Sequence, residues 1–115
     1  MEFGLNIECE SKGQKTVLRL RGRIDAATSG ILEKEIQDNL NKKNYRLTLD
    51  FFEVDYLSSA GMRVLLSAAK KIKAQNGSFS LFGINEEVME IIKMAGFDKI
   101  LRIFSTEKEA ISAGD

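Results

Sequence analysis

Hydrophobic and polar residues alternate along this chain with two different periods, and each change of period predicts where a strand gives way to a helix. Segments in which every second residue is apolar, or in which a short apolar run is bounded by turn residues, are typical of strands. The predicted strands cover residues 5–11, 15–21, 45–51, 79–82 and 100–104. Lys12-Gly13 predicts a tight turn after the first strand, with residue 11 paired with residue 14.

Four other segments carry apolar residues at helical spacing. The predicted helices run from Asp25 or Thr28 to about Asn41, over residues 59–75, from Asn85 to Gly96, and from a capping box at Thr106 to about Ser112. Strands that alternate with helices in this way favour an α/β fold with a mostly parallel sheet, to which the opening hairpin adds an antiparallel edge. We expect a single domain over residues 1–115.

Three arginines, Arg19, Arg21 and Arg23, recur along the second predicted strand. The hairpin pairing places Glu8 and Glu10 on the same face as Arg19 and Arg21, which predicts cross-strand ion pairs. An anion site built from the three arginines is the alternative interpretation.

The composition excludes several classes of site. Lys and Arg together number 17, as do Asp and Glu, so the formal charge is zero and we expect no direct binding of nucleic acid. The chain contains no His and only one Cys, which excludes imidazole or multi-thiolate metal sites and an internal disulfide. That residue, Cys9, shares the apolar face of its strand with Leu5 and Ile7, so we predict that it is buried. We find no phosphate-binding loop and expect neither a cofactor nor a metal.

The chain also carries no targeting or membrane signal. No apolar run approaches the roughly 20 residues that a membrane-spanning helix needs, and no signal-peptide pattern opens the sequence. We therefore expect a cytoplasmic protein without membrane insertion.

Two adjacent serines, Ser58 and Ser59, mark the junction between the third strand and the second helix. If Ser58 is the N-cap, its hydroxyl accepts a hydrogen bond from the amide of Ala60 or Gly61, and the hydroxyl of Ser59 is left free. The positive end of the helix dipole favours a phosphate there, and the small residues that follow would leave the approach open. One interpretation is that both serines are simply tolerated at a helix start; the other is that Ser59 is a phosphoacceptor.

The motifs of this chain resemble those of the anti-sigma factor antagonists, which are single STAS domains of bacteria. The similar segments are Gly22-Arg23-Ile24-Asp25, Leu49-Asp50-Phe51-Phe52-Glu53-Val54, Tyr56-Leu57-Ser58-Ser59-Ala60-Gly61-Met62 and Met94-Ala95-Gly96-Phe97, and the resemblance covers nearly the whole chain. It implies that Ser59 is the phosphorylated serine and that Asp25 is the aspartate that lies near it. Ser58 stands where the family has Asp, which is an N-cap of similar strength.

The resemblance also implies a partner-switching regulator. The unmodified antagonist binds an anti-sigma factor that is also a serine kinase, phosphorylation weakens the complex, and a serine phosphatase reverses it. The protein is then a substrate and not an enzyme. The implied partner-binding residues are Asp25, Ser58, Ser59, Gly61, Met62 and Arg63.

Two other functions remain open from the sequence. One is a constitutive STAS scaffold of a signalling or transport assembly, in which Ser59 is never modified. The other is a small nucleotide-binding domain or enzyme that uses Asp25, Asp50 and Asp55. Near the end of the third helix, Met89, Met94 and Phe97 are either core filling or a small contact patch.

Overall fold

Five strands form one mixed sheet in which the order in space follows the order in the chain. The computed structural model describes residues 4–114. The strands are β1 (Leu5–Lys12), β2 (Lys15–Ile24), β3 (Arg46–Leu57), β4 (Ser78–Phe82) and β5 (Arg102–Phe104). β1 pairs with β2 in antiparallel orientation, and the three other pairings are parallel. This confirms the predicted α/β fold with an antiparallel hairpin at one edge.

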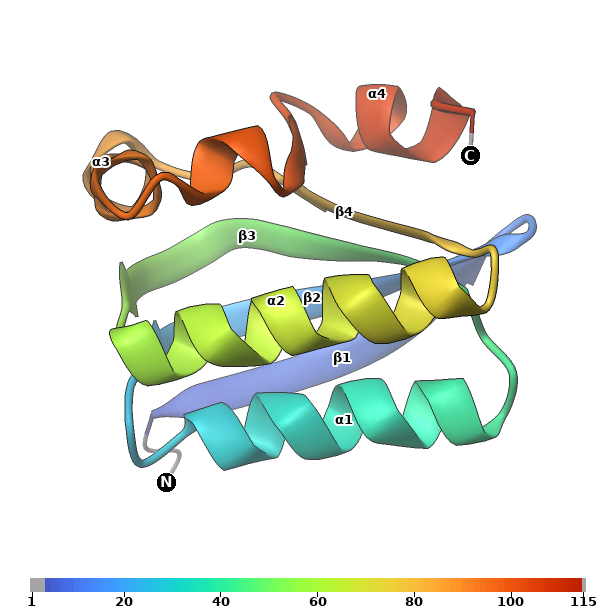
Figure 1. The fold of residues 1–115 in the computed structure, drawn as a ribbon, viewed down its shortest axis with the longest axis horizontal. Helices are drawn as coiled ribbons and strands as arrows, with labels where there is room; N and C mark the ends of the chain where they lie inside the picture. The colour runs from blue at the N-terminus through green and yellow to red at the C-terminus, as the bar shows by residue number, and fades with distance from the viewer. Residues whose placement is uncertain (1–3, 115) are drawn as a thin grey trace.

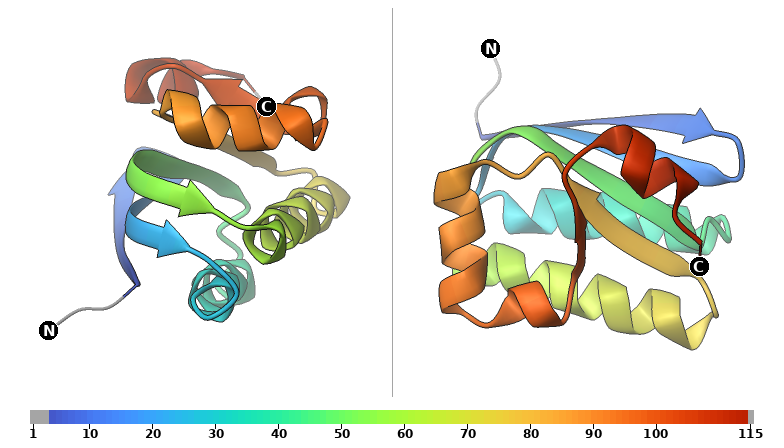
Figure 2. Two further views of the ribbon diagram at one scale, coloured as in Figure 1. Left: turned by 90° about the vertical axis from the view of Figure 1, so that its left-hand side faces the viewer. Right: turned by 90° about the horizontal axis from the view of Figure 1, so that it is seen from above.

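The helices cover both faces of the sheet. They are α1 (Ser29–Asn41), α2 (Ser59–Ala74), α3 (Glu86–Met94) and α4 (Glu107–Ser112), and a short 3₁₀ helix, η1 (Phe97–Lys99), precedes β5. α1 and α2 lie side by side on one face, whereas α3 and α4 lie on the other (Figures 1 and 2). Fully buried side chains of the main core include Leu18, Leu32, Leu49, Leu65, Ile72, Leu81 and Ile92. Val17, Phe82 and Ala110 form a smaller cluster that joins α4 to the sheet.

The hairpin turn lies one residue later than predicted. Lys12 pairs with Lys15, so the turn residues are Gly13, which has a positive φ of 65°, and Gln14. The predicted pairing of residues 11 and 14 is therefore wrong. The paired numbers now sum to 27 instead of 25, and because this change is even, the same side chains still share a face.

The ion pairs predicted for that face are present. Arg19 Nε donates to Glu10 at 2.7 Å, and Arg21 Nη1 lies 3.4 Å from Glu8. Arg19 also contacts Asp50 and Glu107. The arginine row is thus engaged with carboxylates, as the cross-strand interpretation proposed.

β3 runs six residues beyond its predicted end at Phe51. The pairing of β2 with β3 shifts twice, because β3 inserts an extra residue after Asp50 and another after Val54. The amide of Phe52 donates to the carboxylate of Asp50 at 2.9 Å at the first shift. Such bulges break the two-residue alternation, which is why the sequence pattern suggested a connection through Phe52 and Glu53.

Cys9 is exposed, and the prediction that it is buried is wrong. It lies on the edge strand, where its Sγ is 3.8 Å from Oδ1 of Asn39 near the end of α1. Alternation gives the face of a strand correctly but does not say how far a helix covers that face. Although Cys9 is exposed, neighbouring atoms shield its thiol from part of the solvent. This desolvation, followed by the nearby carboxylate of Glu35, raises the pKa of the Cys9 thiol, which keeps it in the less reactive neutral form.

The structure also shows which of the residues Met89, Met94 and Phe97 are buried and which are exposed. Met94 is 88% exposed, whereas Met89 and Phe97 are partly buried, and Phe97 packs against the main core. η1 occupies the residues just before Ile100, so the last strand begins at Arg102 and not at residue 100. Over residues 4–114, no helix has both the length and the apolar character that crossing a bilayer requires.

Candidate functional site

The candidate site lies where the carboxyl ends of β2 and β3 meet the start of α2. Ile24 and Leu57, the last residues of the two strands, are paired. The amide of Ser58 then donates to the carbonyl of Ile24 at 2.8 Å. This bond brings Asp25, which follows Ile24, next to the serine pair. The carboxyl edge of parallel strands is where open α/β sheets place their functional residues.

Ser58 is the N-cap of α2, which is the arrangement that leaves the hydroxyl of Ser59 free. Its backbone is extended, and its hydroxyl accepts a hydrogen bond from the amide of Gly61 at 3.1 Å. The carbonyl of Ser58 accepts from the amide of Met62 at 2.9 Å, which starts the helical pattern. One of the unpaired amides of the first helical turn is thereby satisfied.

Ser59 is exposed at the first position of α2. Within the part of the chain that the structure describes, its hydroxyl makes no hydrogen bond. The first turn of this 16-residue helix contains no acidic side chain. The positive end of the helix dipole at Ser59 is therefore not neutralised from within the helix.

Gly61 is buried, and its lack of a side chain serves packing rather than access. A Cβ atom at this position would lie 2.5 Å from Cγ2 of Ile24 and 2.8 Å from Cδ1 of Leu57. The glycine thus lets α2 start directly against the ends of β2 and β3. Met62 is also buried, with 7% of its surface exposed.

The residues predicted to bind a partner therefore fall into two groups. Ser59 and Arg63 are exposed, and Asp25 and Ser58 are partly buried at the surface. Gly61 and Met62 lie beneath that surface. Their contribution to a partner contact would be to position α2.

Asp25 organises the turn that leads into α1. Its Oδ1 accepts hydrogen bonds from the amides of Ala27 and Thr28, each at 3.0 Å. The hydroxyl of Thr28 lies 3.1 Å from the same oxygen, and Arg23 Nε lies 3.7 Å from Oδ2. The amide of Thr28 is the main cause that lowers the pKa of Asp25, so the carboxylate stays ionised.

Arg23 and Tyr56 are a surface pair that the sequence analysis did not single out. They are paired across β2 and β3, and the guanidinium of Arg23 lies 4.5 Å from the centroid of the Tyr56 ring. Tyr56 is 37% exposed and lies two residues before Ser58. The bulges in β3 hid this pairing, because its register cannot be read from the residue numbers.

Of the three carboxylates of the nucleotide-binding alternative, Asp55 is exposed on β3, and the two others have structural partners. Asp50 binds Arg19 at 3.0 Å and the amide of Phe52, whereas Asp25 holds the turn before α1. Across residues 4–114, no cluster of three or more Asp, Glu, Cys or His residues could hold a metal ion. Nothing in this geometry favours that alternative.

Comparisons with known proteins place these features in a family. The family model of the STAS domain matches residues 6–110. BtrV of Bordetella bronchiseptica is 32% identical over 94 residues, which are 82% of this chain and 81% of that protein. The anti-sigma-F factor antagonist RsfB of Mycobacterium tuberculosis is 30% identical over 96 residues, which are 84% of this chain and 78% of RsfB.

Solved structures share the fold. The anti-sigma factor antagonist SpoIIAA in its unphosphorylated form has a TM-score of 0.78 at 19% identity, over 92% of this chain and 93% of that one. The phosphorylated form of SpoIIAA from Bacillus has a TM-score of 0.70 at 18% identity, over 92% and 96% of the two chains.

Proposed function

This chain belongs to the STAS domain family, and on that premise we propose that it is an anti-sigma factor antagonist controlled by phosphorylation of Ser59. The observation that carries the proposal is that the two adjacent serines have different roles. Ser58 supplies the N-cap, and Ser59 is exposed with a hydroxyl that is free to be modified. The names of RsfB and SpoIIAA support the antagonist role, and the two forms of SpoIIAA support control by phosphate.

Physical chemistry favours a phosphate at this position without loss of the fold. Phosphorylation adds about 1.5 to 2 negative charges at pH 7. At Ser59 these charges would meet the positive end of the α2 dipole and no acidic side chain of the first helical turn. The modified protein would keep its structure and change its surface charge.

The partner surface then centres on Ser59 and the exposed start of α2. Arg63 lies one turn further along the helix, and Asp25 lies beside Ser58. The Arg23–Tyr56 pair adds an aromatic ring and a guanidinium, which are enriched at protein interfaces. The partner in this proposal is an anti-sigma factor with serine-kinase activity, which binds the unmodified form. A serine phosphatase restores binding, and the chain itself catalyses no reaction.

Binding measurements on purified proteins test the proposal. The anti-sigma factor kinase of the same organism is titrated with the wild type, Ser59→Ala and Ser59→Asp. We expect Ser59→Ala to bind as the wild type does and Ser59→Asp to bind at least about tenfold more weakly. Ser29→Asp is the matched control, because Ser29 is the first residue of the neighbouring helix α1, and it should bind normally.

Phosphopeptide analysis of protein from its native cells provides the second test. A phosphorylated peptide that spans residues 47–63 should appear under at least one growth condition. Equal binding of Ser59→Asp and the wild type, with no such peptide, would contradict the proposal and favour a constitutive scaffold.

A further inference from the structure

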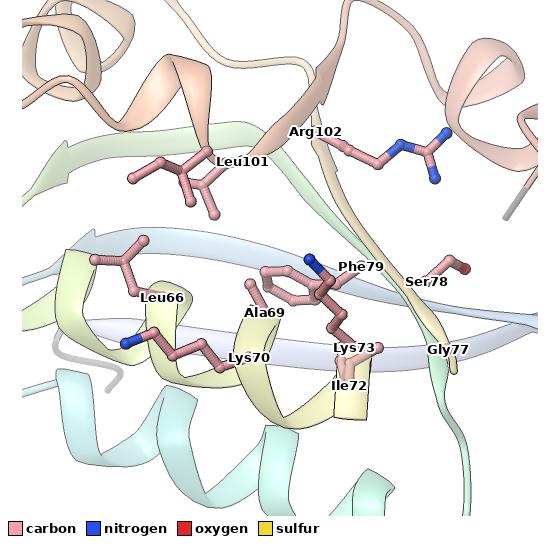
Figure 3. Close-up of a pocket in the computed structure, with 11 residues that line it drawn as sticks. Leu66, Ala69, Lys70, Ile72, Lys73, Gly77, Ser78, Phe79, Leu101 and Arg102 are labelled. Carbon is pink, nitrogen blue, oxygen red and sulfur yellow. The ribbon is translucent and has the colours of Figure 1, made fainter. Parts of the chain in front are cut away.

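A groove with an apolar floor and a cationic rim opens between the second half of α2 and the segment that leads into β5. Its volume is about 380 Å³. Leu66, Ala69, Phe79 and Leu101 contribute to the floor, and Lys70, Lys73 and Arg102 contribute the charges. Figure 3 shows the ring of Phe79 beside Ala69 and Lys73, with Leu101 across the groove and the guanidinium of Arg102 and the hydroxyl of Ser78 toward the right of the view.

Lys70, Lys73 and Arg102 bring three positive charges to this groove, and the guanidinium of Arg102 lies 5.4 Å from the centroid of the Phe104 ring. Arg19, Arg21 and Lys34 each form ion pairs with carboxylates. Within residues 4–114, Lys70, Lys73 and Arg102 form none, and no Asp or Glu lines the groove. The chain as a whole is neutral, so this is a local excess of positive charge.

The apolar lining of the groove reaches solvent mainly at its edge. Phe79 and Leu101 are largely buried, at 7% and 5% exposure, but Ile100 at the edge of the groove is 62% exposed. Covering such surface with an apolar group is favourable. The volume also falls in the range of small-molecule sites, which combine apolar walls with a few polar groups that fix orientation.

We propose that this groove binds an amphiphilic carboxylate, such as a fatty acid. The acyl chain would cover Leu66, Phe79 and Leu101, and the carboxylate would meet Lys73 and Arg102, with Ser78 as a further donor. A neutral apolar ligand would gain nothing from the three charges, and a small polar anion would leave the floor uncovered. Only a molecule with both parts matches both observations.

This site is separate from the start of α2. Lys73 lies 14 residues after Ser59, which corresponds to about 21 Å along a helix. None of the groove residues contributes to the contacts around Ser58 or Asp25. The proposal of ligand binding in this groove therefore does not depend on whether Ser59 is phosphorylated.

Titration with decanoate, kept below its micelle concentration and followed by amide NMR, tests the proposal. We expect saturable shifts at Phe79, Leu101 and Arg102. Decanol and acetate are the matched ligands, because one lacks the charge and the other lacks the chain, and each should bind at least about tenfold more weakly.

Two triple variants identify the cations that matter. Lys70→Gln, Lys73→Gln and Arg102→Gln together should weaken decanoate binding at least about tenfold. All three residues are exposed, so the fold should be kept. Lys71→Gln, Lys93→Gln and Lys108→Gln remove three exposed charges outside the groove and should leave binding unchanged.

Several results would overturn the proposal. These are no binding of decanoate, equal binding of decanoate and decanol, shifts confined to other surfaces, and equal effects of the two triple variants. Shifts at the groove that depend on protein concentration alone would assign it to a second copy of the chain. Binding of an acidic amphipathic peptide in place of decanoate would assign it to a protein segment, and would likewise overturn the proposal.

Discussion

Gly61 lies so close to Ile24 that a Cβ atom on the glycine would be 2.5 Å from Cγ2 of Ile24 and 3.3 Å from its carbonyl oxygen. The same carbonyl accepts the amide of Ser58, so the end of β2 is fixed against the first turn of α2. The position of the serine pair therefore depends on a contact that only glycine permits.

Gly61→Ala should destabilise the protein. The added methyl group must displace Ile24 and Leu57, and overpacking of this kind costs about 1–3 kcal/mol. Gly30→Ala is the matched control, because Gly30 lies in α1 with no atom near its Cβ position, and it should raise the free energy of unfolding by about 0.5 kcal/mol. Urea unfolding measures both. A stable Gly61→Ala variant would contradict the close packing of α2.

Ser58→Ala should lower the free energy of unfolding by about 1 kcal/mol, because the amide of Gly61 loses its acceptor. Ser59→Ala should change it by less than about 0.5 kcal/mol, since Ser59 is exposed at the surface. Ser58→Asp keeps the cap and should be as stable as the wild type. Thermal and urea unfolding distinguish these variants. Equal losses of unfolding free energy for Ser58→Ala and Ser59→Ala would mean that the hydroxyl of Ser59 also stabilises the fold.

Arg19 forms ion pairs that connect the β1–β2 hairpin to β3 and α4. It contacts Glu10, Asp50 and Glu107, the last through two nitrogens at 2.9 and 3.1 Å. We expect Arg19→Gln to lower the free energy of unfolding at pH 7 by about 1–2 kcal/mol, because hydrogen bonds to charged groups are lost at partly buried positions. Arg21→Gln on the same strand is the control and should cost less, since the Arg21 side chain is 52% exposed.

The ion pairs of Arg19 also predict how the stability of the protein depends on pH. The hydrogen bond from Arg19 is the main cause that lowers the pKa of both Glu107 and Glu10 below the ordinary value of 4.5. A carboxylate with a lowered pKa in the folded state stabilises the fold above its unfolded pKa, and this contribution is lost as the pH falls through the folded value. The wild type should therefore lose stability below pH 4.5, and Arg19→Gln should lose less over the same range. Parallel pH profiles of the two proteins would contradict this account.

The sequence predicted the parts of the fold that depend on local chemistry. The side chains of the N-cap residues Ser58, Asn85 and Thr106 each accept a hydrogen bond from the backbone amide three residues later. Such contacts can be predicted from the sequence because both partners lie within one helical turn. The mostly parallel sheet with its antiparallel edge followed from the alternation of strands and helices. The exposed Ser59 followed from the assignment of the cap to its neighbour.

Apart from the boundary errors at the hairpin turn and at the start of β5, the features that were missed depend on distant segments. The bulges of β3 come from its pairing with β2, so the strand end and the Arg23–Tyr56 contact were not readable from local pattern. The sequence pattern suggests that the small residues after Ser59 keep the phosphate approach open, but the role of Gly61 arises from Ile24, 37 residues earlier in the chain. Cys9 is exposed because coverage by α1 is a property of helix placement rather than of alternation.

Asp25 allows its structural role to be separated from its role at the proposed partner surface. Asn is as good a capping acceptor as Asp, so Asp25→Asn should keep the bonds from Ala27 and Thr28 and the stability of the wild type, whereas Asp25→Ala should be less stable. If the carboxylate also faces the anti-sigma factor, Asp25→Asn should slow association at low salt, and the difference should vanish as salt screens the charge. Stopped-flow association rates at two ionic strengths measure this effect, with unfolding curves as the control for structure. Identical rates for Asp25→Asn and the wild type at low salt would restrict Asp25 to the turn before α1, because this substitution removes the charge and the ion pair with Arg23 but keeps the acceptor of the turn.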